Sequence, residues 1–194
     1  MTAGMIPAAE VPAEEVGVPA GGHDVVLVDG SAAEIRRCYL GDKDALAQMY
    51  SRVSSKSLYR RFFGVSRSVV PADIERVTRV GPDGHVAVVA LLGDEIIGLA
   101  SYELLADEHQ AELSVLVDDL HQGLGVGRLL VQELVTAAVA GGVTTLIAEI
   151  LPNNVTMLHL LHHTGYPLDV EWVPGVMHVE LDLRAEAASS ADGD

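Results

Sequence analysis

A short glycine-rich segment between an apolar stretch and a helical pattern constrains the fold of this chain more than any other feature. The apolar stretch ends at residues 115–117, glycines occupy positions 123, 125 and 127, and apolar residues then recur at helical spacing to Ala140. This pattern predicts a strand, a tight turn and the start of a helix. The first amides of a helix have no intrahelical acceptor, and the helix dipole favours negative charge there. The segment therefore predicts a site for an anion such as a diphosphate, which the glycines allow close to the backbone.

The spacing of these glycines disfavours two other phosphate-binding motifs. A Walker loop requires Lys and then Ser or Thr after its last glycine, whereas Gly127 is followed by Arg128 and Leu129. A dinucleotide fingerprint places its third glycine three positions after the second, and Gly125 is followed at that distance by Arg128. A tight strand-to-helix turn without any ligand is the remaining alternative.

Residues 122–127 resemble the pyrophosphate loop of the GNAT acetyltransferases, Gln/Arg-x-x-Gly-x-Gly/Ala, and the resemblance extends over residues 33–183. Asn154, followed by Gly165 and Tyr166, resembles the second coenzyme-contacting helix of that family. A helix cap is an equally ordinary use of Asn154. The resemblance implies acetyl-CoA as co-substrate, no metal, and direct transfer of the acetyl group to an amine. The coenzyme-binding residues that it implies are Val115, Leu116, Val117, Gln122, Gly123, Leu124, Gly125, Val126, Gly127, Arg128 and Asn154.

Strand-like and helical patterns follow each other along residues 23–184, which predicts one α/β (α+β) domain there. An Asp-Gly turn at Gly30 predicts an early hairpin, and helices are expected from a cap at Asp42, around residues 57–63 and from Pro71. Gly93 with Asp94 predicts a turn between two strands, and Gly141 with Gly142 predicts the end of the helix that follows the glycine-rich segment. The resemblance implies a mixed, mostly antiparallel sheet with a splayed central strand pair and helices on both faces. Residues 1–22 and 185–194 have no apolar periodicity and are predicted to be disordered tails.

Glu112 is the candidate general base. It interrupts an apolar-leaning strand just before the glycine-rich segment, where partial burial would raise its pKa, although an outward-facing strand residue in solvent fits the pattern equally well. Residues 57–63 and 111–127 resemble the bacterial Pat-type protein lysine acetyltransferases, in which a glutamate at this place is the base. The resemblance implies that Glu112, directly or through a water, deprotonates a lysine amine, whose ordinary pKa is ~10.4.

The sequence departs from the family pattern at two positions. Leu124 stands where many relatives carry a basic residue that supports phosphate binding, and Leu161 stands where many carry a tyrosine that protonates the leaving thiolate. A coenzyme A thiol leaves acceptably near its own pKa, so transfer does not require that acid. Phe62 and Phe63 are expected in the core, with Tyr59, Arg60 and Arg61 at the acceptor entrance.

Charge and composition limit the partners. With 28 acidic and 12 basic residues the net charge is -16, which repels nucleic acids and anionic lipids and suits a lysine-bearing protein, or serves solubility alone. Cys38 is the single cysteine and no apolar run is long enough to span a membrane, so a cytoplasmic protein, monomeric or homodimeric, is expected. His159 and His163 are spaced like zinc ligands on a helix, but the sequence supplies no third ligand.

Three functions fit these features. The first is a protein lysine acetyltransferase, for which the Pat-type resemblance implies acyl-CoA synthetases as substrates. The second is an enzyme that acetylates a small amine, which requires a closed acidic pocket. The third is a non-catalytic acyl-CoA sensor, which would bind the coenzyme without transferring its acetyl group.

Overall fold

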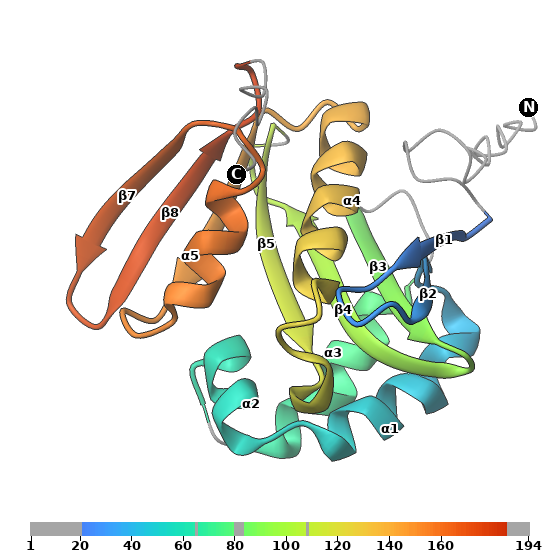
Figure 1. The fold of residues 1–194 in the computed structure, drawn as a ribbon. Coiled ribbons are helices and arrows are strands. Elements are labelled where there is room, and N and C mark those ends of the chain that lie inside the picture. The colour runs from blue at the N-terminus through green and yellow to red at the C-terminus, as the bar shows by residue number, and fades with distance from the viewer. Residues whose placement is uncertain (1–20, 65, 80–83, 108, 186–194) are drawn as a thin grey trace, which may run out of the picture.

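The computed structural model describes residues 21–64, 66–79, 84–107 and 109–185, so the predicted tails fall almost wholly outside it. Helices cover both faces of an eight-stranded sheet (Figure 1). In chain order the elements are β1 (His23–Val26), β2 (Ala32–Arg37), α1 (Lys43–Arg52), α2 (Ser55–Phe62), α3 (Val70–Val77), β3 (His85–Leu92), β4 (Glu95–Leu104), β5 (Gln110–Val117), α4 (Val126–Ala140), β6 (Thr145–Ile150), α5 (Val155–His162), β7 (Leu168–Val173) and β8 (Val176–Asp182).

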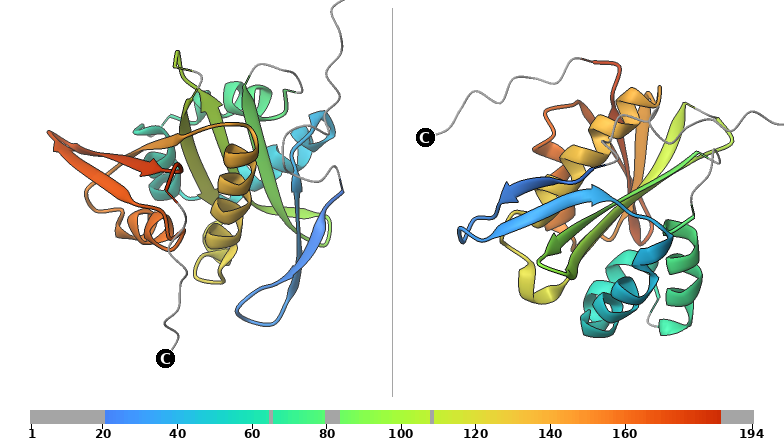
Figure 2. Two further views of the ribbon diagram at one scale, coloured as in Figure 1. Left: turned by 90° about the horizontal axis from the view of Figure 1, so that it is seen from above. Right: turned by 90° about the vertical axis from the view of Figure 1, so that its right-hand side faces the viewer.

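The strands lie in the order β1-β2-β3-β4-β5-β6-β8-β7. Every neighbouring pair is antiparallel except β5 and β6, which run parallel because α4 crosses over between them. The sheet twists along its length (Figure 2). This confirms the mixed, mostly antiparallel α/β fold expected from the sequence.

The central pair of strands separates part-way along its length. Pairing between β5 and β6 ends at Glu112 and Ile147, although β5 continues to Val117 and β6 to Ile150. The splayed central pair is thereby confirmed. The carboxyl end of β5 has a partner strand on the β4 side only.

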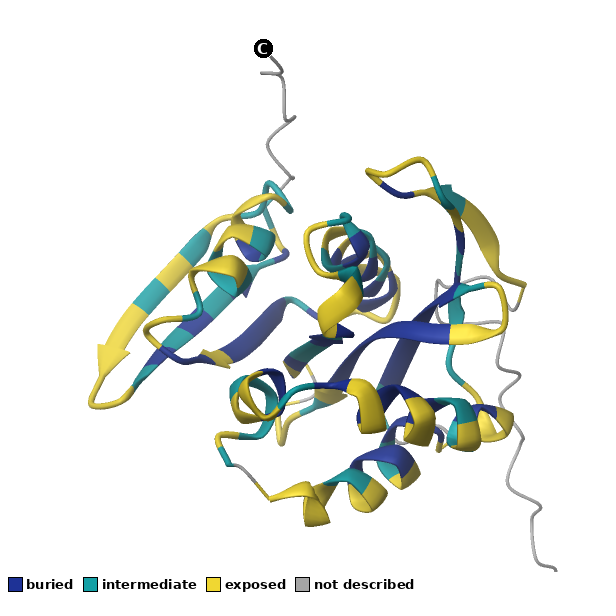
Figure 3. Ribbon diagram, turned by 60° about the horizontal axis from the view of Figure 1, so that its bottom comes forward, coloured by how far each residue is buried: buried dark blue, intermediate teal, exposed yellow. Residues whose placement is uncertain are grey.

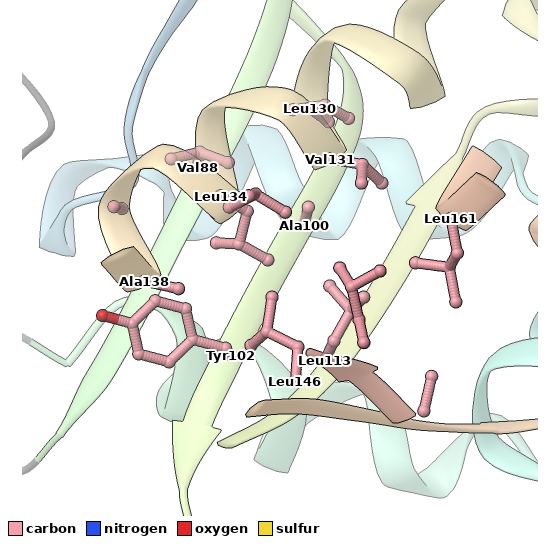
Figure 4. Close-up of a cluster of buried hydrophobic side chains, with 14 of the residues drawn as sticks. Val88, Ala100, Tyr102, Leu113, Leu130, Val131, Leu134, Ala138, Leu146 and Leu161 are labelled. Carbon is pink, nitrogen blue, oxygen red and sulfur yellow. The ribbon is translucent and has the colours of Figure 1, made fainter. Parts of the chain in front are cut away.

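Two hydrophobic cores lie on opposite faces of the sheet, since successive strand side chains point to alternate faces. In β5, Leu113 belongs to the core under α4 and α5, whereas Leu116 belongs to the core under α1, α2 and α3. Figure 4 shows the first core, which includes Val88, Ala100, Tyr102, Leu130, Leu134, Leu146 and Leu161. The central strands are buried, while the outward sides of the helices and much of β7 are exposed (Figure 3).

Gly98 allows α4 to lie close to the sheet. A Cβ atom at this position of β4 would come within 2.8 Å of the Leu130 side chain and 2.9 Å of Val126. Both of these residues belong to the first half of α4 and are fully buried. The close contact fixes the start of α4 beside the end of β5.

The structure corrects two local predictions. Phe63 is not in the core: it ends α2 with φ 53 in the left-handed region and is 42% exposed, and only Phe62 packs against the second core. Asp42 does not cap α1 through its side chain. It is buried in a bidentate ion pair with Arg36, with oxygen-to-nitrogen distances of 2.7 and 2.8 Å, and it also accepts a hydrogen bond from the Tyr39 amide.

A buried polar cluster joins α1, α2 and α3. The Asp73 carboxylate lies 3.2 Å from Arg61 Nη2 and 2.6 Å from Arg76 Nη2, and it also accepts a hydrogen bond from the Tyr50 hydroxyl. Burial alone would raise the pKa of Asp73, but Arg61, the Tyr50 hydroxyl and Arg76 together hold that pKa below its ordinary value. The cluster therefore contains a charged carboxylate that is neutralised by two guanidinium groups.

His85, at the start of β3, makes the stability of the fold depend on pH. Burial, with a further contribution from the positive charge of Arg76, lowers the pKa of His85 to about 4. In the unfolded chain the imidazole has a pKa of about 6.5. Between that pH and the lower pKa of the folded state, the unfolded chain binds a proton at His85 and the folded chain does not, so stability falls as the pH falls. We expect the free energy of unfolding to fall by about 1 kcal/mol per pH unit from this residue between pH 6 and 4.5.

Urea denaturation of His85→Gln at pH 7 and pH 5 tests this expectation. The variant should lose less stability than the wild type over that interval, because its side chain cannot take up a proton. His162→Gln, at an exposed position of α5, is the matched control and should follow the wild type. Equal losses in the wild type and His85→Gln would contradict the assignment.

Candidate functional site

A pocket of about 220 Å³ opens at the carboxyl end of β5. Its walls come from the end of β5, the loop that leads into α4, the exposed face of α2 and the first turns of α5. The lining residues are Ser57, Arg60, Val115, Leu116, Val117, His121, Gln122, Gly123, Gly125, Gly127, Arg128, Asn154, Thr156, Met157 and Leu160. The structure thus brings the predicted coenzyme-binding residues together, with two exceptions. Val126 is buried beneath the loop, and Leu124 packs against the first core.

The backbone at the start of α4 presents free N–H groups. Gly125 is the N-cap residue with φ 89, and Gly123 has φ 81, both in the left-handed region that favours glycine. No side chain caps this helix, and its first hydrogen bond runs from Leu129 N to Gly125 O at 3.1 Å. The amides of residues 126–128 therefore have no intrahelical acceptor, which is the arrangement that binds anions.

The splayed edge of β5 presents further backbone groups. Asp118 donates its N–H to Ile97 O at 2.9 Å, so it points toward β4. Successive strand residues direct their backbone hydrogen-bonding groups to alternate edges, so Val115 and Val117 direct their N–H and C=O groups to the edge facing β6. Pairing with β6 has already ended at Glu112, so β6 does not bond to these groups. Gln122 Nε2 donates to Val117 O at 3.1 Å on that side.

Asp119 ties α2 to the loop before α4. Its carboxylate accepts hydrogen bonds from Ser54 N at 2.8 Å, Ser54 Oγ at 2.7 Å and Ser57 Oγ at 2.9 Å. Gln122 Nε2 in turn donates to Ser57 Oγ at 3.2 Å. Burial would raise the pKa of Asp119, but these hydrogen bonds outweigh it and lower that pKa. The start of α2 and the loop are thereby held as one unit.

The charge of the pocket is opposite to that of the chain. Among the described residues that line it there is no Asp or Glu, whereas Arg60 and Arg128 both carry a positive charge. The whole chain has a net charge of -16. A cationic lining in so acidic a protein favours an anionic ligand.

Asn154 and Leu161 lie on α5 in different environments. Asn154 is the N-cap residue of α5, yet its side chain makes no capping hydrogen bond, and the residue lines the pocket. The structure therefore gives no support to the cap as the role of this side chain. Leu161 is 1% exposed in the first core and offers no acid to the pocket.

Glu112 lies outside the pocket and is exposed, so the expected partial burial is not found. It is the last residue of β5 that pairs with β6, opposite Ile147. Val115 lies three positions further along β5, which corresponds to about 10 Å along a strand. Glu112 thus stands where the two central strands begin to diverge.

Residues 52–166 match the model of the acetyltransferase (GNAT) family. This stretch covers more than half of the chain and contains the splayed strands, the glycine-rich loop and α5. The chain belongs to the GNAT acetyltransferase family. The fold and the family are those of acetyl-CoA-dependent N-acetyltransferases.

Relatives of this GNAT protein include Pat-type enzymes. The acetyltransferase Pat of Mycolicibacterium smegmatis is 30% identical over 136 residues, which make up 67% of this chain and 39% of that protein. The chain thus spans about two fifths of the length of this relative. The GNAT domain of S. lividans PAT superposes with a TM-score of 0.76 at 32% identity, covering 90% of this chain and all of that one. The fold is shared with yncA of Salmonella typhimurium, solved with its cofactor acetyl-CoA, at a TM-score of 0.65, 22% identity and coverage of 82% and 99%.

Part of the lining of this GNAT pocket was not predicted from the sequence. Of the residues expected at the acceptor entrance, only Arg60 lines the pocket; Arg61 is buried against Asp73, and Tyr59 is exposed. Met157 and Leu160 were also missed. Their spacing of three residues from Asn154 and from each other places them on one helical face, and this signal was available in the sequence.

The described part of the chain contains neither a metal-binding cluster nor a membrane-spanning helix. No group of three or more His, Cys, Asp or Glu side chains there could hold a metal ion, and His163 Nδ1 lies 2.7 Å from the carbonyl oxygen of His159. None of the described helices has the length and apolarity needed to cross a bilayer.

Proposed function

We propose that this chain binds acetyl-CoA in the pocket at the end of β5 and transfers the acetyl group to a lysine amine of a protein. The observation that carries the proposal is the set of free amides at residues 126–128, which open into a pocket without carboxylates. These amides hold the diphosphate of the coenzyme, as helix starts do for phosphate groups in general. The acetyl-CoA bound to yncA and the similarity to Pat support the ligand and the reaction.

The pantetheine arm lies along the splayed edge of β5 in this proposal. The free N–H groups of Val115 and Val117 face that edge, and Asn154 lines the same pocket. One of these backbone amides donates to the thioester oxygen, where negative charge develops in the tetrahedral intermediate. The strand thus positions the acetyl group and stabilises the transition state with the same backbone.

Glu112 serves as the general base through a water molecule. Because Glu112 is exposed and lies outside the pocket, its carboxylate suits a proton relay through water better than direct contact. The deprotonated lysine nitrogen attacks the acetyl carbon, and the C–S bond to the coenzyme breaks. Leu161 is buried, so the thiolate takes its proton from solvent.

The acceptor is a lysine-bearing protein, and the Pat-type similarity makes acyl-CoA synthetases the first candidates. A small-amine enzyme would require an acidic pocket, and the described lining contains no carboxylate. Leu161, which is buried and offers no acid to the leaving thiolate, favours one second candidate, a sensor that binds acetyl-CoA without turnover. We place the catalytic domain at residues 23–184 and its activity in the cytoplasm, in keeping with a single cysteine, Cys38.

Calorimetry with acetyl-CoA tests the coenzyme site. We expect the wild type to bind, and Gly125→Ala to bind at least about 10-fold more weakly, because a side chain at φ 89 strains the loop and shifts its amides. Gly142→Ala is the matched control, since Gly142 has φ 79 at the opposite end of α4 and lies outside the pocket. No binding by the wild type at millimolar coenzyme would refute the proposal.

Incubation with acetyl-CoA and a cell lysate, read by acetyl-lysine mass spectrometry, tests the acceptor class. New acetyl-lysine in specific proteins is expected for a protein acetyltransferase. Binding without transfer to any protein or small amine would assign the chain to the sensor class instead.

A further inference from the structure

The two arginines of the pocket differ from most others in the chain in having no side-chain bonding partner among the described residues. Arg60 and Arg128 line the pocket, and within the described residues neither guanidinium has a hydrogen-bond or ion-pair partner. Six other arginines are all bonded to carboxylates or backbone carbonyls: Arg36, Arg52, Arg61, Arg67, Arg76 and Arg184. Arg37 and Arg79 also have no side-chain partner among the described residues, but neither lines the pocket. Most arginines of the chain are thus bonded within it, whereas the two in the pocket are available to a ligand.

Arg60 has a fixed place opposite the loop. It follows Ser57 by one turn of α2, so both residues lie on one face of the helix and both line the pocket. Ser57 is bonded to Asp119 and to Gln122, which lead directly into the glycine-rich turn. The next residue, Arg61, points to the other side of α2 and is buried against Asp73. The orientation of α2 is therefore set from both sides, with Arg60 at the wall of the pocket.

Leu124, in the loop itself, supplies no polar group to the pocket. Leu124 packs its side chain against the first core, and its carbonyl accepts a hydrogen bond from Val28 N at 3.1 Å. Arg128 is exposed on the first turn of α4. A guanidinium is planar and presents paired donors that match phosphate oxygens, and it strengthens binding most where no carboxylate competes.

We propose that Arg60 binds the diphosphate of the coenzyme and adds a side-chain cation to a site whose other donors are backbone amides at the start of α4. The diphosphate is then held from two sides, by backbone amides of α4 and by a side chain of α2. This inference rests on the proposed function, because it concerns the same ligand. It adds a coenzyme-binding residue from α2, which the sequence analysis associates only with the entrance for the acceptor.

Calorimetry with three ligands tests the assignment. The ligands are coenzyme A, 3′-dephospho-coenzyme A and pantetheine, so that the diphosphate and the 3′-phosphate are removed in separate steps. Arg60→Gln should weaken binding of both phosphate-bearing ligands about 10-fold or more, because a charge-assisted hydrogen bond is lost, and should leave pantetheine unchanged. Arg60→Lys should recover part of the loss, since it keeps the charge but not the paired donors.

A matched control separates the role of this position from the general charge of the chain. Arg184→Ala, which removes an exposed arginine far along the sequence, should have no effect. Circular dichroism melting identifies any variant that does not fold.

The outcomes separate this inference from the proposed function. A wild type that binds no coenzyme overturns both. A wild type that binds, together with an Arg60→Gln variant of equal affinity, overturns the role of Arg60 alone. If Arg60→Gln weakens binding of coenzyme A but not of the dephospho form, Arg60 contacts the 3′-phosphate. If it weakens binding of pantetheine equally, Arg60 maintains the shape of the pocket. Either result overturns the diphosphate assignment.

Discussion

Glu112→Gln will lower the rate of lysine acetylation at least about 100-fold, which is the usual contribution of a positioned general base. The amide cannot accept the proton from the incoming ammonium group, whereas the shape of the side chain is nearly unchanged. Acetyl-CoA affinity should stay the same, because Glu112 does not line the pocket. Steady-state rates with a lysine-bearing acceptor, together with calorimetry, measure the two quantities separately.

Glu103→Gln is the matched control for this variant. Glu103 lies directly opposite Glu112 on β4, and its side chain is 50% exposed. It should retain wild-type turnover. If Glu112→Gln and Glu103→Gln acetylate lysine at equal rates, Glu112 is not the base, and the splayed backbone alone supports whatever transfer is measured.

Asp73→Ala will lower the free energy of unfolding by about 3–5 kcal/mol, the range seen when one partner of a buried ion pair is removed. The Arg61 side chain is 6% exposed, so the substitution leaves a guanidinium buried without its counter-charge. The Tyr50 hydroxyl also loses its acceptor. Urea denaturation followed by circular dichroism measures the change.

Glu75→Ala serves as the comparison, because Glu75 lies two residues further along α3. Its carboxylate makes an ion pair with Lys43 at 2.6 Å, but its side chain is 66% exposed. A solvent-exposed pair of this kind is worth about 0–1 kcal/mol. A loss in Asp73→Ala no larger than that in Glu75→Ala would show that the buried cluster does not stabilise the packing of α2 on α3.

The sequence predicts the elements of this fold well where glycines interrupt them. Gly30, Gly93 and Gly142 each have positive φ and end or turn an element at the place that the pattern indicates. The glycine-rich segment also predicts the pocket, because a strand, a turn and a helix start are local features. The separation of β5 from β6 was expected from the family resemblance alone, because no local sequence pattern indicates where two paired strands diverge.

The predictions failed, or could not be made, where the outcome depends on distant residues. Asp119 bonds to Ser57, 62 positions away, so the link between α2 and the loop leaves no local signal. The exposure of Glu112 depends on which helices cover its side of the sheet, and alternation alone cannot assign a strand residue to the covered side. Phe63 leaves the core because α2 ends in a left-handed turn, although its composition suits burial.

The parting of the central strands also determines how the molecule can move. Only three residue pairs join the sheet across this seam, from Gln110 with Thr145 to Glu112 with Ile147. On either side, antiparallel ladders tie β1 to β5 and β6 to β8 into separate blocks. A short seam between two stiff blocks is a natural hinge, so we expect small rotations about it to widen or narrow the gap without breaking a ladder bond.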